Sequence, residues 1–169
     1  YPPRKNGGQN FKKYRGLIMN AIQISDNKTL KLTNVLSRTF TAEEMGNAML
    51  ILTQMDNFIK SHGAQPIGPL IQHVEVSGGA NPTATFRFLR QASDFIPRMD
   101  PEYHMDAVLR VRNCLYAHYT GPMAKSQLAS QKLSIHAFEN DIELRNSVYT
   151  IYVNQDEDDA VVDVFMETC

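Results

Sequence analysis

The sequence predicts an α+β fold made of two copies of a strand–helix–strand–strand unit. Two stretches with helical spacing of apolar residues each lie between stretches with strand-like alternation. The order of strand, helix, strand, hairpin and strand occurs twice, which indicates a duplicated unit. At a shift of about 79 residues one set of apolar positions falls on another: Leu30, Leu32, Val35, Leu36, Phe40 and Thr41 on Leu109, Val111, Cys114, Leu115, Tyr119 and Thr120.

The first half begins with a short strand over Ala21–Ser25, a turn at 26–28 and a strand over Leu30–Phe40 with a bulge at Asn34. A helix follows. Thr41 and Glu44 have the spacing of a capping box, and Gly63 suits a left-handed C-terminal cap. The apolar positions that we expect on its buried face are Met45, Ala48, Met49, Leu52, Met55 and Ile59.

Two strands complete the first half, over 70–76 and 83–89, and Gly78-Gly79 forms the hairpin between them. The segment 91–103 contains two prolines and is a connection. The second half repeats the order: strands over 105–119, 144–153 and 161–166, and an acidic turn over 154–159. Its helix starts at Thr120-Gly121-Pro122, and we expect its buried face to hold Ala124, Leu128, Gln131, Ile135, Phe138 and Ile142.

We therefore expect one domain over 21–169, with repeats over about 21–90 and 104–169. Each half packs one amphipathic helix on its strands and leaves the other sheet face apolar, so the halves bury those faces against each other. They do so as two curved antiparallel sheets or as one continuous sheet. The seam at the pseudo-twofold axis leaves a cleft, where small ligands usually bind.

Composition excludes several classes of protein. The chain has 169 residues, 43% of them apolar, and a formal net charge of −1, which argues against a nucleic-acid binder. Two cysteines are too few for a disulfide framework and favour a reducing, cytoplasmic setting. Because no apolar run approaches the roughly 18 residues of a membrane span, we expect no membrane partner. Residues 1–20 form a basic leader that we expect to be flexible.

Three motifs resemble the GyrI-like (gyrase-inhibitory-protein-like) effector-binding domain, the ligand-sensing half of multidrug-responsive transcription regulators. They are Lys60-Ser61-His62-Gly63 with Pro66-Ile67-Gly68-Pro69, then His118-Tyr119-Thr120-Gly121-Pro122, and finally 148–154 with 162–166. The resemblance implies an aromatic-lined cleft in which a buried carboxylate attracts lipophilic cations. The family's glutamate position, two residues before Tyr152, is Thr150 here. Neutral or polar ligands, or another acid such as Glu75 or Asp163, therefore remain open. The family's DNA-binding half has no counterpart, so a DNA-binding partner domain or protein is also open.

Candidate ligand-binding residues follow from strand alternation. Val148, Thr150 and Tyr152 share one strand face and should face the cleft, if Tyr149, Ile151 and Val153 pack under the helices. For each candidate, a purely structural role is the alternative. The remaining candidates for the same cavity are Tyr116, His118, Phe86, Phe88 and Glu75.

No catalytic residue, cofactor or metal site is assigned. The sequence lacks a nucleophile elbow, a phosphate loop and a dinucleotide fingerprint. His136 and Glu139 could share a helix face, but no other histidine has ligand spacing with them.

The first functional hypothesis is a domain that binds a small lipophilic or aromatic molecule and acts in transcription regulation or drug sensing. The second is a small hydrolase in the same cleft, using Tyr116, Tyr152 and an acid to position water. The third is a protein-interaction or inhibitor module acting through the acidic loop 156–159.

Overall fold

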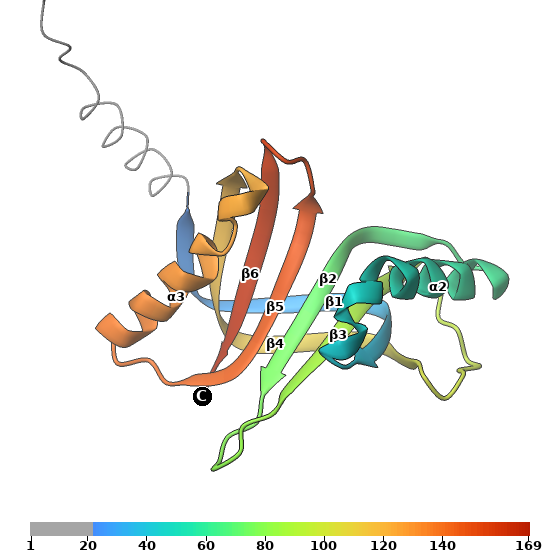
Figure 1. Cartoon of the computed structure of the whole chain (residues 1–169), viewed down its shortest axis with the longest axis horizontal. Coiled ribbons are helices and arrows are strands. Elements are labelled where there is room, and N and C mark those ends of the chain that lie inside the picture. The colour runs from blue at the N-terminus through green and yellow to red at the C-terminus, as the bar shows by residue number, and fades with distance from the viewer. Residues whose placement is uncertain (1–21) are drawn as a thin grey trace, which may run out of the picture.

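The computed structural model describes residues 22–169, so the basic leader and Ala21 lie outside the described residues. The expected α+β class is confirmed, with two main helices and six antiparallel strands (Figure 1). The strands are β1 (Gln23–Phe40), β2 (Pro66–Val76), β3 (Ala84–Ala92), β4 (His104–Gly121), β5 (Leu144–Asn154) and β6 (Ala160–Thr168). The helices are η1 (Glu43–Asn47), α2 (Ala48–Ser61), η2 (Met123–Lys125) and α3 (Leu128–Glu139).

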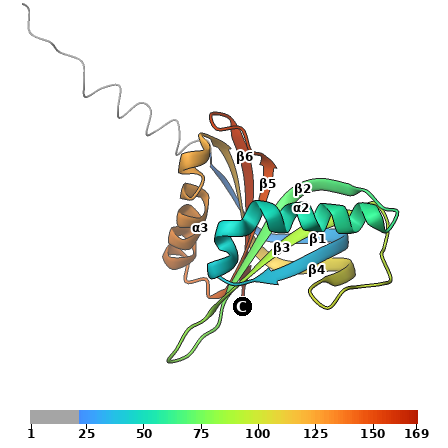
Figure 2. The same cartoon turned by 45° about the vertical axis from the view of Figure 1, so that its right-hand side comes forward.

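The sheet is continuous and closes into a barrel in the order β1-β3-β2-β5-β6-β4. Every neighbouring pair is antiparallel, and the long strands β1 and β4 pair with each other to complete the ring. Helix α2 packs on β2 and β3, and α3 packs on β4 and β6, so the helices cover different parts of the barrel wall (Figure 2). Among the described residues, no helix is long and apolar enough to cross a membrane.

The two halves match in strand length. β1 and β4 have 18 residues each, β2 and β5 have 11, and β3 and β6 have 9. The two halves meet at two strand pairs, β1–β4 and β2–β5, and we call the β2–β5 pair the seam. Its register is symmetric about the pair Gln72–Thr150. A duplication predicts such a symmetric pairing. When the two halves are aligned by these registers, Leu70 is equivalent to Val148 and Arg90 is equivalent to Met166.

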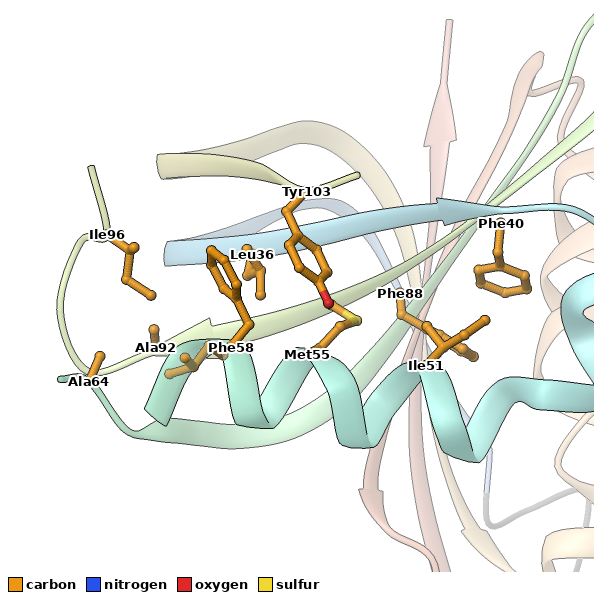
Figure 3. Close-up of a cluster of buried hydrophobic side chains, with 11 residues drawn as sticks. Leu36, Phe40, Ile51, Met55, Phe58, Ala64, Phe88, Ala92, Ile96 and Tyr103 are labelled. Atoms are coloured by element: carbon orange, nitrogen blue, oxygen red, sulfur yellow. The ribbon is translucent and has the colours of Figure 1, made fainter. Parts of the chain in front are cut away.

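Three apolar clusters hold the fold together. One lies inside the barrel and contains Ile71, Leu89, Cys114 and Ile151 among others. A second lies between α2 and the barrel wall, where Ile51, Met55 and Phe58 point toward the strands (Figure 3). The third lies beneath α3. The barrel interior therefore takes up the second apolar sheet face that the sequence predicts.

The buried faces of both helices differ from those that the sequence predicts. On α2 the predicted Met55 and Ile59 are buried, and Ala48 and Leu52 pack against the same cluster, but Ile51 and Phe58 are buried as well. The predicted Met45 and Met49 are exposed. On α3 the buried residues are Ala129, Leu133 and Ala137. The predicted Leu128 and Ile142 pack against their cluster, whereas Gln131, Ile135 and Phe138 are exposed. Each helix carries two adjacent apolar stripes, and contact with the sheet selects one of them. On α3 the selected stripe contains alanines, which allow a close approach.

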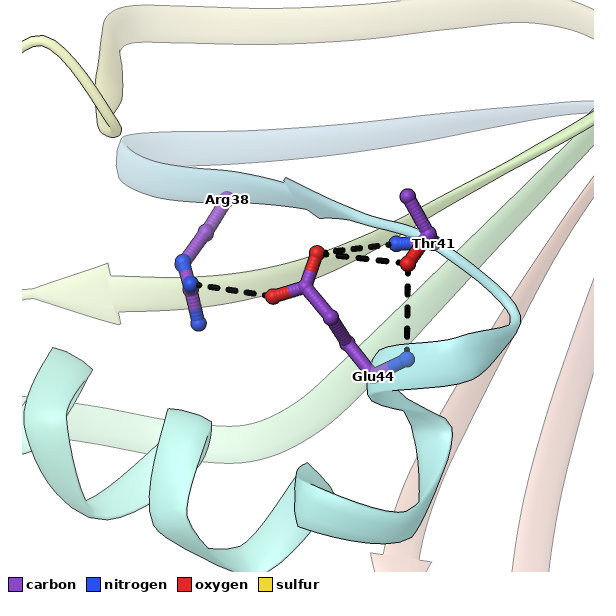
Figure 4. Close-up of polar contacts among 3 residues, drawn as sticks. All are labelled: Arg38, Thr41 and Glu44. Carbon is purple, nitrogen blue, oxygen red and sulfur yellow. Dashed lines mark hydrogen bonds and ion pairs between the residues drawn. The ribbon is translucent and has the colours of Figure 1, made fainter.

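The predicted capping box is present, but it starts the short 3₁₀ helix η1 rather than α2 (Figure 4). Thr41 N donates to Glu44 Oε1 at 3.2 Å, and Glu44 N donates to Thr41 Oγ1 at 3.4 Å. The other oxygen of Glu44 pairs with Arg38 at 3.3 Å. The predicted stop at Gly63 is confirmed: its φ is +80°, a value that favours glycine.

The predicted turn over 26–28 is wrong. Residues 26–28 lie within β1, where the pairing with β4 shifts register on either side of Lys28. Asn27 has a φ of +53°, a left-handed conformation that asparagine tolerates better than most residues. The register changes without breaking the strand, because the local turn chemistry is absorbed as a bulge. Asn34 also has a positive φ, +50°, but the β1–β4 register is unchanged there.

Candidate functional site

A cleft of about 620 Å³ lies between α3 and the barrel wall. Its volume is within the roughly 300–1,000 Å³ typical of small-molecule sites. Helix α3 forms one side and strands β2, β5 and β6 form the other. The lining residues are Val74, Ser130, Gln131, Ser134, Ile135, Val148, Thr150 and Met166. None of them is ionisable, so the cleft presents hydroxyl, amide and apolar groups without a formal charge.

The floor of the cleft lies at the seam between the two halves. Thr150 pairs with Gln72 at the centre of the β2–β5 register, and Val74 pairs with Val148. Paired residues of neighbouring strands point to the same side of a sheet, so these side chains share the face that α3 covers. The fold therefore places Thr150 on the cleft floor, beneath α3. The expectation that Tyr149 and Ile151 pack under the helices is wrong, because both lie in the barrel interior.

The equivalent positions next to α2 are occupied by an ion pair. Arg90 Nε lies 2.9 Å from Asp56 Oδ1, and its guanidinium also donates to the carbonyl oxygen of Gly68. Aligning the strands and the helix C-termini of the two halves matches Arg90 with Met166, and Asp56 with Ser134. Where the first half has a guanidinium and a carboxylate that meet, the second has a thioether and a hydroxyl. The difference leaves space beneath α3.

Tyr152 lies on the same strand face as Thr150 but does not line the cleft. It is half-buried against the cluster beneath α3, and its hydroxyl donates to Gln72 Oε1 at 3.3 Å. Burial raises the pKa of Tyr152, so the phenol stays protonated near neutral pH. Tyr152 therefore packs between the sheet and the cluster beneath α3, next to the β2–β5 pair.

Phe86 and Phe88 lie on the helix-covered side of the barrel, but near α2 rather than α3. Phe88 is 4% exposed, and its ring centroid lies 4.5 Å from that of Phe40. Phe86 stacks on Phe40 at 5.8 Å. Both rings therefore pack in the cluster beneath α2, away from the cleft.

Tyr116 and His118 lie on the sheet face opposite to Thr150. Tyr116 pairs with Phe165, which packs on the barrel-interior cluster, whereas the helix-facing cluster contains the adjacent Leu115 and Ala117. The expectation that they line one cavity with Thr150 is wrong. The reason is that a strand in a closed barrel has apolar packing on both faces, so alternation alone cannot tell the two sides apart.

These two residues instead form a polar cluster with Asp163. Tyr116 Oη donates to Asp163 Oδ1 at 2.8 Å, and His118 Nδ1 lies 2.6 Å from the same oxygen. Burial, followed by the bond to Asp163, raises the pKa of Tyr116 to about 12. Glu75 lies on the barrel-facing side of β2 at an exposed strand end. It belongs neither to the cleft lining nor to the polar cluster of Tyr116, His118 and Asp163. The acid that the sequence leaves open for a cation is therefore not at the cleft.

A second polar cluster, in the barrel interior, was not predicted from the sequence. His73 is 3% exposed and stacks on Tyr149. Arg87 Nε donates to His73 Nδ1 at 3.1 Å, so Nε2 carries the proton and donates to Ser147 Oγ at 2.8 Å. Ser147 in turn donates to Glu167. Burial and then the charge of Arg87 lower the pKa of His73 from 6.5 to about 4, so the imidazole is neutral.

The acidic loop that joins β5 to β6 is partly organised by its own carboxylates. Asp156 Oδ1 accepts hydrogen bonds from the backbone N–H groups of Asp158 and Asp159 at 3.0 and 3.4 Å. Met123 N donates to the carbonyl oxygen of Glu157 and links the loop to η2. Within residues 22–169, no group of three or more metal-ligating side chains is placed to hold an ion.

The chain is similar to known proteins in its fold rather than in its sequence. No protein-family model and no curated protein matches the sequence. The crystal structure of the C-terminal domain of EcmrR is similar with a TM-score of 0.66 and 12% identity, over 88% of this chain and 98% of that domain. The EcmrR–DNA complex in EcmrR-RPo gives 0.67 and 13%, over 95% of this chain. SAV2435 bound to tetraphenylphosphonium gives 0.52 and 8%, over 88% and 93%.

The chain has the GyrI-like effector-binding fold. The resemblance stated from the three sequence motifs is thus confirmed at the level of the fold. The chain spans 62% of the length of the EcmrR chain seen with DNA.

The cleft-lining residues that the sequence did not single out as candidates are on α3. Ser130, Gln131 and Ser134 form the helix side of the cleft. Serines on an amphipathic helix have the pattern of a solvated face, so periodicity alone does not single them out. The spacing of Ser130 and Ser134, one turn apart on one helix face, is the available signal.

Proposed function

We propose that this chain is a small-molecule effector-binding domain whose ligand occupies the cleft beneath α3. The observation that supports this most directly is the open, uncharged cleft of about 620 Å³ at the seam, with Thr150 on its floor. The GyrI-like fold adds support, because SAV2435 has a similar fold and binds tetraphenylphosphonium. The apolar lining provides the driving force for a lipophilic ligand.

We propose further that ligand binding serves transcription regulation. The supporting finding is the similarity to EcmrR, which has been seen in complex with DNA. Because this chain spans 62% of the EcmrR chain, DNA contact would come from a further domain or a partner protein. The ligand would then change how that DNA-binding part is held.

The experiment that tests ligand binding is a variant in which the cleft is closed. Ser134→Asp with Met166→Arg would place beneath α3 the same two side chains that form the ion pair Asp56–Arg90 beneath α2. Thermal-shift screening of neutral aromatics and lipophilic cations identifies ligands for the natural chain, and calorimetry then measures their affinity. We expect the closed variant to bind those ligands at least tenfold more weakly.

A matched control places the same two substitutions away from the cleft. Ser61→Asp with Met45→Arg changes two exposed residues of the first half and should leave the affinity unchanged. Failure of the whole library to stabilise the natural chain would contradict the proposed function. Equal affinity in the natural and closed chains would place the ligand outside the cleft.

Hydrolysis is a second candidate, and a specific geometry favours it. Asp163 holds His118 by its Nδ1 at 2.6 Å, and His118 is about one-third exposed. In such a pair the carboxylate fixes the tautomer that leaves Nε2 as the basic nitrogen. His118 Nε2 would take a proton from water as its oxygen attacks an ester carbonyl, and would return that proton to the departing alkoxide. This site differs from the cleft hydrolase that the sequence suggests.

The surface of the chain offers a control for this candidate. His104 lies 3.0 Å from Asp106, but its side chain is 68% exposed. Hydrolysis of p-nitrophenyl acetate should be lost in His118→Gln and retained in His104→Gln. Turnover that is equal in both variants, or no greater than that of free imidazole, would remove this candidate.

A further inference from the structure

The two serine hydroxyl groups on the helix side of the cleft donate their protons to backbone carbonyl groups of α3 and of the residue that precedes it. Ser130 Oγ donates to the carbonyl oxygen of Gln127 at 3.1 Å, and Ser134 Oγ donates to that of Ser130 at 3.1 Å. A serine hydroxyl has one proton and two acceptor lone pairs. Both side chains line the cleft, so toward a ligand they act only as hydrogen-bond acceptors.

The floor supplies a complementary group. Thr150 is half-buried, and its hydroxyl makes no hydrogen bond within the described part of the chain. It is therefore available as a donor or an acceptor. Leaving such a group unpaired when a ligand excludes water is unfavourable, because its hydrogen bond to water is lost and not replaced. A ligand that occupies the cleft must therefore provide a polar atom there.

The lining also decides the charge of the ligand. Its other residues are the amide Gln131 and the apolar Val74, Ile135, Val148 and Met166. An ionic ligand would lose hydration on entering and would meet no opposite charge among these side chains. Desolvation of an unpaired ion is much more costly than that of a hydroxyl, so neutral molecules are favoured.

We infer that the ligand of this cleft is an uncharged lipophilic molecule whose polar end carries a hydrogen-bond donor, such as an alcohol, a phenol or an amide N–H. The donor contacts the acceptor oxygens of Ser130 and Ser134, and the same polar end satisfies Thr150. The inference rests on the proposed function, because it names the ligand class of the same site. It separates this chain from a receptor for lipophilic cations.

Three matched compounds test it. 4-Phenylphenol carries a donor, 4-methoxybiphenyl has the same rings without one, and the trimethyl(biphenyl-4-yl)ammonium ion carries a charge. We expect 4-phenylphenol to bind about tenfold more tightly than 4-methoxybiphenyl, which is the effect of about one hydrogen bond. The cation should bind more weakly than either, as measured by calorimetry on the full chain.

Side-chain variants then locate the contact. Ser134→Ala should lower the affinity for 4-phenylphenol to that for 4-methoxybiphenyl, and leave the latter unchanged. Ser61→Ala is the control, because Ser61 donates to the carbonyl oxygen of Phe58 in the same way on α2. Thr150→Glu supplies a carboxylate on the floor and should reverse the order in favour of the cation.

The outcomes separate this inference from the proposed function. If all three compounds bind equally, and the closed variant Ser134→Asp with Met166→Arg loses them, the cleft is a ligand site but the donor inference is wrong. A natural chain that prefers the cation also overturns the inference. If none of the three binds while another library compound does, the inference fails and the proposed function stands. If no compound binds, both fail.

Discussion

Acid should destabilise this protein through His73, the buried histidine of the barrel interior. Burial and the neighbouring Arg87 lower the pKa of the folded-state imidazole from 6.5 to about 4. Between these values the unfolded chain binds a proton that the folded chain does not, so stability falls as pH falls through this window. The full difference corresponds to about 3 kcal/mol. Between pH 7 and pH 4.5 the expected loss is about 2 kcal/mol.

Urea unfolding at pH 7 and pH 4.5 measures this loss in the natural chain and in His73→Gln, which has no imidazole to protonate. The variant starts less stable at pH 7, because its contacts with Arg87 and Ser147 change. Its further loss on acidification should be smaller by about 2 kcal/mol. The difference between the two losses isolates the contribution of the imidazole.

His104→Gln is the control, because the His104 side chain is 68% exposed. Its pH dependence should match that of the natural chain. If the natural chain and His73→Gln lost the same free energy between the two pH values, His73 would not be the group responsible. The description of a neutral, hydrogen-bonded imidazole in the barrel interior would then be wrong.

Three further changes test the packing by urea unfolding. Gly121→Ala should lower the free energy of unfolding by about 1–3 kcal/mol. Gly121 has a φ of +145°, and an added Cβ would lie 2.9 Å from Tyr119 Oη. An unchanged stability would contradict this geometry. Glu44→Ala should lower the free energy of unfolding by about 2 kcal/mol, because the Arg38 side chain is only 17% exposed and loses its ion pair. A loss no greater than that expected for an exposed ion pair would show that Arg38 is solvated. Met49→Lys should change stability by less than about 0.5 kcal/mol, because Met49 is 76% exposed; a large loss would restore the sequence-based expectation that Met49 is a core residue.

Local sequence signals predicted the elements of this fold well, and their faces less well. Alternation and capping located the strands, the start at Thr41 and the stop at Gly63, because these depend on neighbours within a few residues. The buried face of α2 depends on which of two apolar stripes meets the sheet. Met49 and Ile51 are equally apolar in the sequence, and only the packing of the barrel distinguishes them.

The candidate site shows the same division. Alternation along β5 correctly separates Val148, Thr150 and Tyr152 from Tyr149 and Ile151, but the two faces were assigned the wrong way round. Thr150 lies on the face that α3 covers, and Tyr149 and Ile151 lie in the barrel interior. Tyr116 and His118 were assigned to the wrong cavity, because both faces of β4 are backed by apolar residues. Ser130 and Ser134 were missed because their role depends on where α3 lies over the sheet.

Closure of the barrel has a consequence for how the molecule can meet other chains. The ring is closed, but β1 pairs with β3 only over Val35–Phe40, and β4 pairs with β6 only over Cys114–Gly121. Residues 23–34 and 104–113 therefore have a strand partner on one side only, and a foreign strand can extend the described sheet only along these two edges. Elsewhere on the barrel, contacts with partners must be made through side chains, and the exposed apolar residues of α2 and α3, among them Leu50 and Phe138, are prominent among those available.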